Sequence, residues 1–341
     1  ELDEGNVYEC LQEGWKHDLR NTWWVIDYNR QSLDGVVREG LWEKIEAIFK
    51  AFGWRTVVLR HGVLQRAAFE EPGGEILKTW IQDCPNPDYS ALTFQGGGAW
   101  RKRLMDDIGD QGEVSELLNK RSDEELNTLM NNLGGQCLQT LTDAFDAIQD
   151  DKPTVFLAYT IKGWQTPLAG HKDNHAGLMN TAQMAEFQKV MGIEKGEEWD
   201  ALANVEDEES LKAFLADVPF FSKGTRRFTA PKVEPTGPVF LDDRVLSTQA
   251  GFGKILDNIA KSKSELADRI VTTSPDVTVS TNLGPWVNRR NLFARRAVSD
   301  TFREQSIPST QKWSFSPEGQ HFELGIAEMN LMLMLGSLGL A

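Results

Sequence analysis

Three polar segments of the sequence carry residue types that can do chemistry, and the first is the loop at residues 27–35. In it, the side-chain carbonyl of Asn29 and the main-chain carbonyl of Gln31 could offer two hard oxygens to one side of a Mg²⁺ or Ca²⁺ ion. An ordinary Asx-rich turn, closed by Asp34 and Gly35, would explain the same residues without any ligand. The pattern therefore predicts a tight turn and leaves open whether it binds a metal.

The second segment, residues 160–177, holds two of the five histidines in the chain. His171 and His175 are four residues apart, beside glycines that permit main-chain mobility or close approach to a ligand. The sequence offers no convincing third zinc ligand nearby, so acid–base or oxyanion chemistry fits the pair better than metal binding. The alternative interpretation is that both are solvent-exposed loop histidines.

The third segment, residues 319–331, contains Glu328 at the start of a strongly apolar helix. A carboxylate is costly to bury there unless it is protonated or strongly hydrogen-bonded, which would suit a functional group. An acidic residue is also favoured at a helix N-terminus by the helix dipole alone. Both interpretations stay open for Glu328.

Short apolar runs predict the strands that must position these segments, namely Thr22–Ile26, Thr56–Leu59 and Thr154–Tyr159. Apolar residues at helical spacing separate them, over residues 42–52 and 138–148, and Ser122 with Glu125 forms a capping box. This alternation predicts an α/β fold with a doubly wound parallel sheet covered on both faces. Ligands bind such sheets outside the carboxyl ends of the strands, where the first two polar loops lie.

The second half of the chain predicts a further α/β domain after a linker. Residues 195–217 are acidic and helical in character, and residues 223–238 are rich in proline, which suits a linker. We therefore expect a first domain at residues 1–222 and the start of a second at residues 239–341. Elements predicted in the second are a helix over Val245–Ile259, a strand over Arg269–Thr273 and a helix over Gly325–Ala341.

The composition limits the classes of protein to which the chain can belong. A formal charge of -15, from 51 acidic and 36 basic residues, argues against a nucleic-acid or anionic-membrane surface. Three sparse cysteines favour reduced thiols and a cytoplasmic location over a disulfide framework. The apolar segment Leu324–Ala341 is interrupted by Glu328 and Asn330, so a core helix is expected instead of a membrane span. Neither end resembles a natural terminus, and we expect both to be truncations.

Together and in this order, the segments resemble the thiamine-diphosphate-dependent enzymes of the transketolase-like group, most closely the homodimeric pyruvate dehydrogenase first component. The opening residues 1–5, Glu-Leu-Asp-Glu-Gly, are similar to those that follow the family's Gly-Asp-Gly metal motif. The resemblance implies that Asn29 and Gln31 bind Mg²⁺. It implies that the cofactor is contacted by Glu1, Asp27, Lys162, Gly163 and Glu328.

The resemblance also implies catalytic roles. His175 matches a histidine that faces the reaction centre of the cofactor, and His171 matches a second one found mainly in transketolases. The loop at residues 274–278 resembles one that places an aspartate, here Asp276, near the substrate. Glu328 lies in a motif whose glutamate hydrogen-bonds the pyrimidine ring of the cofactor and activates it.

The implied activity is oxidative decarboxylation of a 2-oxo acid, foremost pyruvate, with transfer of the acyl group to a lipoyl-bearing acyltransferase of a multienzyme complex. Residues 94–101 and 131–135 resemble segments of the homodimeric dehydrogenases that transketolases lack. His171 and the loop ending at residues 280–282 instead resemble transketolase, which transfers two-carbon ketol units between sugar phosphates. A third possibility is a non-catalytic interaction protein of the same fold. The resemblance further implies a homodimer with shared sites.

Overall fold

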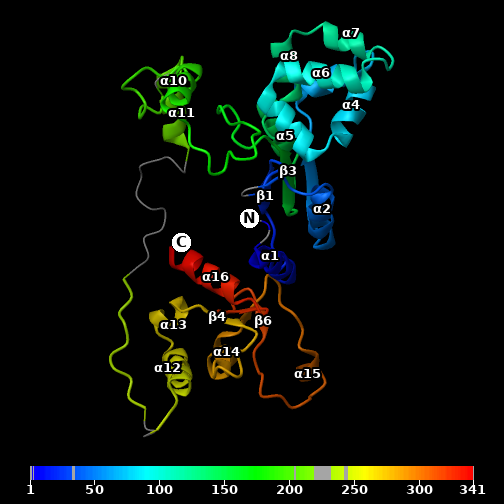
Figure 1. The fold of residues 1–341 in the computed structure, drawn as a ribbon. Helices are drawn as coiled ribbons and strands as arrows, with labels where there is room; N and C mark the ends of the chain where they lie inside the picture. Colours follow the sequence, from blue (N-terminus) through cyan, green and yellow to red (C-terminus); the bar gives the residue numbers. More distant parts are fainter. Residues whose placement is uncertain are drawn as a thin grey trace. The chain divides into compact units, whose positions relative to one another are not determined.

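The computed structural model describes residues 2, 4–32, 35–202, 205–218, 232–241 and 245–340. The chain divides into two compact units, one formed by Arg20–Gly224 and the other by Glu1–Leu19 with Thr225–Ala341. Figure 1 shows the elements of both, and each unit is described by itself. The sequence predicts residues 1–19 in the first domain, whereas the structure groups them with the C-terminal part, because helix α1 (Gly5–Lys16) contacts helix α16 (Glu328–Leu340). The domain boundaries themselves remain a prediction.

Arg20–Gly224 contains a three-stranded parallel sheet, as the sequence predicts. The strands are β1 (Trp23–Tyr28), β2 (Arg55–Leu59) and β3 (Thr154–Tyr159), in the order β1-β3-β2. Thr154 at the start of β3 is in register with Trp23 on one side and Arg55 on the other. Every residue of the central strand β3 is buried, which explains why its sequence is a continuous apolar run.

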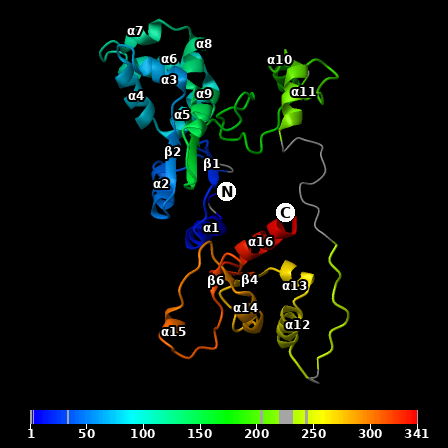
Figure 2. The ribbon, with the colours of Figure 1, turned by 180° about the vertical axis from the view of Figure 1, so that it is seen from behind.

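Helices cover both faces of this sheet. Successive residues of a strand point to opposite faces, and Trp23 and Trp24 of β1 are successive. The ring of Trp23 packs on Phe145 of α9 (Leu138–Asp146), with 5.5 Å between ring centroids. The ring of Trp24 packs on Phe49 of α2 (Leu41–Ala51) at 5.4 Å. Helices α2 and α9 therefore lie on opposite faces (Figure 2), which confirms the predicted α/β arrangement.

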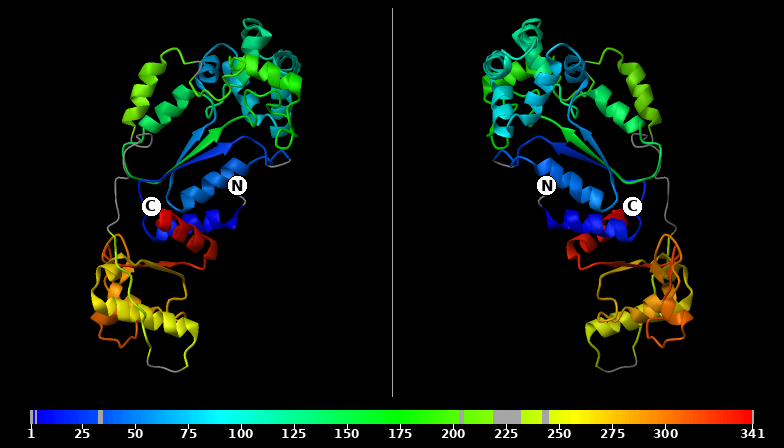
Figure 3. Two further views of the ribbon diagram at one scale, coloured as in Figure 1. Left: turned by 90° about the vertical axis from the view of Figure 1, so that its left-hand side faces the viewer. Right: turned by 90° about the vertical axis from the view of Figure 1, so that its right-hand side faces the viewer.

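A group of helices gathers at the carboxyl ends of the three strands (Figure 3). It consists of α3 (Val63–Phe69), α4 (Gly74–Asp83), α5 (Asn86–Gln95), α6 (Gly97–Ile108), α7 (Val114–Asn119) and α8 (Asp123–Met130). Its apolar centre includes Trp100 and Tyr89, both fully or almost fully buried. The strand-end residues Tyr28 and Tyr159 belong to the same core cluster, so the helical group is anchored directly on the edge of the sheet where ligands are expected.

The later part of this unit differs from one expectation. Helices α10 (Thr181–Val190) and α11 (Glu208–Asp217) are present, but the acidic residues 195–202 form turns and no helix. Gly196 has a φ of +102°, which a right-handed helix does not allow. In the predicted linker, residues 232–238 have no regular structure, and the linker residues before 232 lie outside the described part.

The second unit contains a four-stranded sheet with the order β4-β7-β5-β6, in which all paired strands are parallel. Its strands are β4 (Thr272–Pro275), β5 (Leu292–Phe293), β6 (Phe315–Ser316) and β7 (His321–Leu324). Its helices besides α1 and α16 are α12 (Thr248–Ser262), α13 (Glu265–Arg269), α14 (Gly284–Arg290) and α15 (Thr301–Glu304). The three elements predicted here are all found, within about three residues of their expected limits.

The apolar C-terminal segment forms α16, a helix of 13 residues. Across the described ranges, the structure contains no helix that is both long enough and apolar enough to cross a membrane. The three cysteines are unpaired, with Cys84 and Cys137 buried and Cys10 exposed. Burial raises the pKa of the Cys84 thiol to about 12.

Helix α8 begins with the predicted capping box. The backbone N–H of Glu125 donates to the Ser122 hydroxyl (3.1 Å), and the backbone N–H of Ser122 donates to the Glu125 carboxylate (2.7 Å). Two main-chain donors that the helix leaves unpaired are thus satisfied. The box fixes the start of a helix that carries Leu126 and Met130 into the core.

Replacement of Ser122 by Ala should lower the free energy of unfolding by about 1 kcal/mol, because the N3 amide loses its acceptor. Urea denaturation followed by circular dichroism measures this. Thr128→Ala, at an exposed interior position of the same helix, is the matched control and should leave stability unchanged or slightly raised, since Ala has the higher helix propensity. Equal losses in both variants would contradict the role of the cap.

Candidate active site

The loop after β1 folds as a tight turn around Asn29. The Asn29 side-chain carbonyl accepts a hydrogen bond from the backbone N–H of Gln31 (3.1 Å), which is the Asx-turn geometry that the sequence suggested. A carbonyl oxygen has two lone pairs, so Asn29 Oδ1 keeps one for a second partner. The Gln31 carbonyl accepts no hydrogen bond from any described residue. The turn and the metal-site interpretations are thus compatible in this loop.

Hydrogen bonds join this loop to the one after β3. The Thr160 hydroxyl donates to the Asp27 carboxylate, and Lys162 Nζ donates to the main-chain carbonyl of Ser32 (2.8 Å). Gln31 Nε2 donates to the carbonyl of Gly170 (3.1 Å). Because β1 and β3 are parallel neighbours, their carboxyl ends lie at the same edge, and four predicted cofactor or metal residues meet there: Asp27, Asn29, Gln31 and Lys162.

Gly170 shows why the second loop needs glycine. Its φ is +75°, and a Cβ atom at this position would lie 2.7 Å from the carbonyl oxygen of Ser90 in α5. A side chain would therefore push the loop away from the turn that holds Gln31. Gly163 also has a positive φ, of +72°, next to Lys162.

A small pocket of about 10 Å³ lies between the two loops. Its lining includes Asn29, Gln31, Thr93 and Lys162. The side-chain oxygens of Gln31 (Oε1) and Thr93 (Oγ1) are buried there without a hydrogen-bond partner among the described residues. A volume of this size holds about one water molecule or one ion. The basic residues Arg30 and Lys162 both line the pocket, which is too small for an organic cofactor.

Arg30, between the two proposed metal ligands, is a residue that sequence reasoning missed. Its φ is +63°, and its side chain is only 4% exposed. The guanidinium carbon lies 4.1 Å from the centroid of the Tyr89 ring and 5.2 Å from that of Tyr159, which are cation–π distances. Burial lowers the pKa of Arg30, although the two tyrosines oppose this change. Arg30 thus ties the left-handed turn to the core and adds positive charge beside the pocket.

The end of β2 brings two more basic side chains to the same edge. The guanidinium carbon of Arg60 lies 5.3 Å from the centroid of the Tyr159 ring, and Arg60 Nη2 donates to the carbonyl of Gln82 (2.7 Å). His61 contacts Gln65 through its Nδ1 atom (2.8 Å), and its other ring nitrogen is buried without a described partner. The pKa of His61 is lowered from 6.5 to about 4, mainly by burial and also by nearby cations including Arg60, although the contact with Gln65 opposes this. The rule that strand ends carry function could have singled out both residues, because they directly follow the Thr56–Leu59 run.

The two histidines of residues 160–177 have different environments. The His171 ring packs edge-on against Phe94 at 4.6 Å, and its Nδ1 atom accepts from the backbone N–H of Asp173 (3.1 Å). His175 is exposed. Asn174 between them donates to the carbonyl of Lys162 (3.0 Å), so the histidine loop is fastened to the cofactor-side residues. The catalytic roles of the two histidines remain predictions.

Asp276 and Glu328 lie in the second unit, again after neighbouring parallel strands. Asp276 directly follows β4, and Glu328 is the first residue of α16, which follows β7. Both side chains are exposed. The burial cost considered for Glu328 therefore does not arise in this chain by itself, and its position is the one that the helix dipole favours. Glu1 lies outside the described residues.

Asp276 is held by a polar cluster that the sequence did not reveal. Its backbone N–H donates to the Glu323 carboxylate (2.7 Å), and Nε2 of the buried His321 lies 3.4 Å from Glu323 Oε2. The described ranges contain no group of three or more His, Cys, Asp or Glu side chains that could hold a metal.

The parallel α/β sheet and the polar loops at its carboxyl edge define a class. This class is that of α/β proteins that bind ligands at the carboxyl ends of parallel strands. No protein-family model matches the chain. The pyruvate dehydrogenase E1 component of Pseudomonas aeruginosa is 24% identical to it over 97% of the chain and 39% of the relative. The pyruvate dehydrogenase E1 component of Corynebacterium glutamicum is also 24% identical to the chain, over 96% of the chain and 37% of the relative.

These relatives confirm the family resemblance that the motifs carry: the chain is related over nearly its whole length to pyruvate dehydrogenase E1 components. It spans about two-fifths of the length of those relatives, 39% and 37%. Among solved structures, a transketolase from Campylobacter jejuni is similar at 14% sequence identity, covering 99% of this chain and 39% of that one, with a TM-score of 0.43.

The depressed pKa of His61 predicts a pH dependence of stability. The unfolded chain binds a proton at His61 below pH 6.5, whereas the folded chain does so only near pH 4, so stability is full above pH 6.5 and falls as the pH falls toward 4. From pH 7 to pH 5 the expected loss is about 1–2 kcal/mol. His61→Asn, which does not titrate, should flatten this slope in urea unfolding at both pH values. An unchanged slope would contradict the assignment.

Proposed function

We propose that the protein acts in thiamine-diphosphate-dependent decarboxylation of a 2-oxo acid, foremost pyruvate, and passes the acyl group to a lipoyl carrier. The observation that carries the proposal is the meeting of Asn29, Gln31 and Lys162 at the carboxyl edge of β1 and β3. The relation to pyruvate dehydrogenase E1 components over 97% of the chain supports it.

The donor set at this edge suits a magnesium ion that bridges to a diphosphate. Asn29 Oδ1 and the Gln31 carbonyl are neutral hard oxygens, and the pocket beside them is the size of one ion. Two neutral ligands leave the charge of the ion uncompensated, so anionic oxygens from the cofactor would complete the site. Lys162 and Arg30 add positive charge at the same edge, which favours a diphosphate there.

The other residues assigned to the site would transfer protons or orient the cofactor and the substrate. When bound, thiamine diphosphate supplies the carbanion and electron-sink chemistry of decarboxylation. Glu328, exposed at a helix start, can hydrogen-bond a pyrimidine nitrogen and hold it in the reactive tautomer. His175, exposed on a loop fastened at Asn174, can give or take a proton at the substrate oxygen, because imidazole titrates near neutrality. Asp276 is assigned to the substrate side.

Assembly and partners form part of the proposal. Glu328 and Asp276 belong to one unit, and Asn29 and Lys162 belong to the other. A homodimer in which each site combines the two kinds of unit would bring these residues together, and a lipoyl-bearing acyltransferase would accept the acyl group. The competing function is ketol transfer between sugar phosphates, favoured by His171, which is held between Phe94 and Asp173 at the edge of the site.

Carbon dioxide release from pyruvate by the full-length protein should require both thiamine diphosphate and Mg²⁺. Glu328→Gln should lower kcat about 100-fold or more without changing the melting temperature, because the exposed side chain loses only its proton-directing charge. Glu318→Gln, another exposed glutamate of the same unit, is the matched control and should retain activity. Full activity of Glu328→Gln would refute the assigned role.

Asn29→Ala separates metal binding from the other roles. It should raise the Mg²⁺ concentration for half-maximal activity about 10-fold or more, since one of the two metal ligands assigned within this chain is lost. A parallel assay with sugar phosphates distinguishes the two enzyme functions. Ketol transfer without carbon dioxide release would favour transketolase, and absence of calorimetric cofactor binding by the full-length protein would favour a non-catalytic role.

A further inference from the structure

The second unit contains a buried polar chain that the proposed function does not use. Its centre is His321 on β7, which is 0% exposed. His321 Nδ1 lies 2.8 Å from the Thr272 hydroxyl, and His321 Nε2 lies 2.7 Å from the Thr278 hydroxyl. A buried imidazole with a polar partner on each nitrogen is fixed in position as well as in ring orientation.

The direction of the hydrogen bonds follows from the number of protons. The Thr278 hydroxyl has one proton, which it donates to Glu323 Oε2, so its oxygen accepts from His321 Nε2. Glu323 Oε1 accepts from the backbone N–H of Asp276 (2.7 Å). The chain of donors therefore ends on Glu323, whose two oxygens are held by Thr278 and by the Asp276 amide.

Glu323 is ionised by this arrangement. Burial raises the pKa of a carboxyl group, but here hydrogen bonds from His321, Thr278 and the Asp276 amide outweigh burial, and the pKa of Glu323 lies below its ordinary value. A charged acceptor makes the bond to the Asp276 amide stronger than one between neutral groups. The carboxylate is thus well suited to hold a main-chain segment in place.

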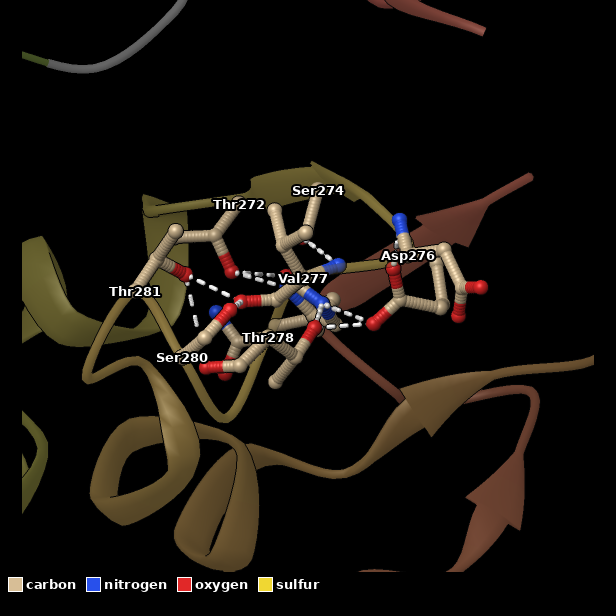
Figure 4. Close-up of polar contacts among 10 residues, drawn as sticks. Thr272, Ser274, Asp276, Val277, Thr278, Ser280 and Thr281 are labelled. Carbon is tan, nitrogen blue, oxygen red and sulfur yellow. Dashed lines mark hydrogen bonds and ion pairs between the residues drawn. The ribbon is translucent and has the colours of Figure 1, made fainter. Parts of the chain in front are cut away.

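The held segment is strained at Asp276. Asp276 has a φ of +64°, a left-handed conformation that is unfavourable for residues with a side chain. The Ser274 hydroxyl accepts from the backbone N–H of Val277 (3.1 Å), and Thr281 donates to the Val277 carbonyl (2.7 Å), so the loop turns sharply after β4 (Figure 4). The only bond from β7 to the Asp276 main chain among the described residues is that of Glu323.

We propose that Glu323 is a positioning residue, fixed by Thr278 and His321, which holds Asp276 in its left-handed conformation and so presents the Asp276 carboxylate to the substrate. The proposal rests on the proposed function, in which Asp276 faces the 2-oxo acid. The anchoring residues are buried or half-buried, whereas Asp276 is exposed, so a rigid strand orients a side chain that solvent and substrate can reach.

Hydrogen–deuterium exchange of the full-length protein tests the positioning without any need for activity. Glu323→Ala should speed exchange of the Asp276 amide about 10-fold or more, because its acceptor is lost. Glu323→Gln should restore much of the protection, since the amide oxygen can still accept that bond. Glu318→Ala is the control and should leave exchange unchanged. Unchanged exchange in Glu323→Ala would overturn the proposal whatever the enzyme does.

A double-mutant cycle tests whether Glu323 acts through Asp276. Glu323→Ala should lower kcat/KM for the 2-oxo acid about 10-fold or more while the Kd for thiamine diphosphate changes less than about threefold. In an Asp276→Ala background, Glu323→Ala should have almost no further effect. Additive losses would show a merely structural role and overturn the proposal. If Asp276→Ala leaves kcat/KM unchanged but exchange responds as expected, the substrate role of Asp276 fails and the positioning stands.

Discussion

Parallel pairing of β1 and β2 with the buried strand β3 is the constraint on which the first unit depends. Because all three strands run the same way, the residues that follow them reach one edge, although they are separated by up to 139 positions in the chain, as for Gln31 and Gly170. Burial of polar groups inside the apolar core costs free energy. At this edge they can hydrogen-bond with one another and with solvent. The site exists because the sheet is parallel.

Positive charge is concentrated at this edge in a chain whose net charge is -15. Arg30 and Arg60 both contact the Tyr159 ring, and neither has a carboxylate partner among the described residues. A guanidinium is weakly hydrated and stacks on aromatic rings, so it can be buried there at a lower cost than an ammonium group. Such charge without a described counter-charge favours an anionic ligand, as the proposed diphosphate would be.

The second unit repeats the principle at smaller scale. Strands β4 and β7 are parallel neighbours, and Asp276 and Glu328 follow them. Here a network of hydrogen bonds from Thr272 to Glu323 replaces the aromatic cage as the support of the exposed residues. Strand β7 thus carries the orienting residues His321 and Glu323. The exposed residues Asp276 and Glu328, which substrate or cofactor must reach, follow the ends of the strands.

The sequence by itself determined the elements and the two loops. The runs at Thr22–Ile26 and Thr154–Tyr159 and the capping box at Ser122 were confirmed, because apolar periodicity and capping depend on residues close in the chain. Residues 195–202 were predicted wrongly, since Gly196 adopts a φ of +102° that a right-handed helix does not allow. Only the tertiary structure revealed Arg30 in its cage of tyrosines and Glu323 on the Asp276 amide, because both depend on contacts between residues that no local pattern connects.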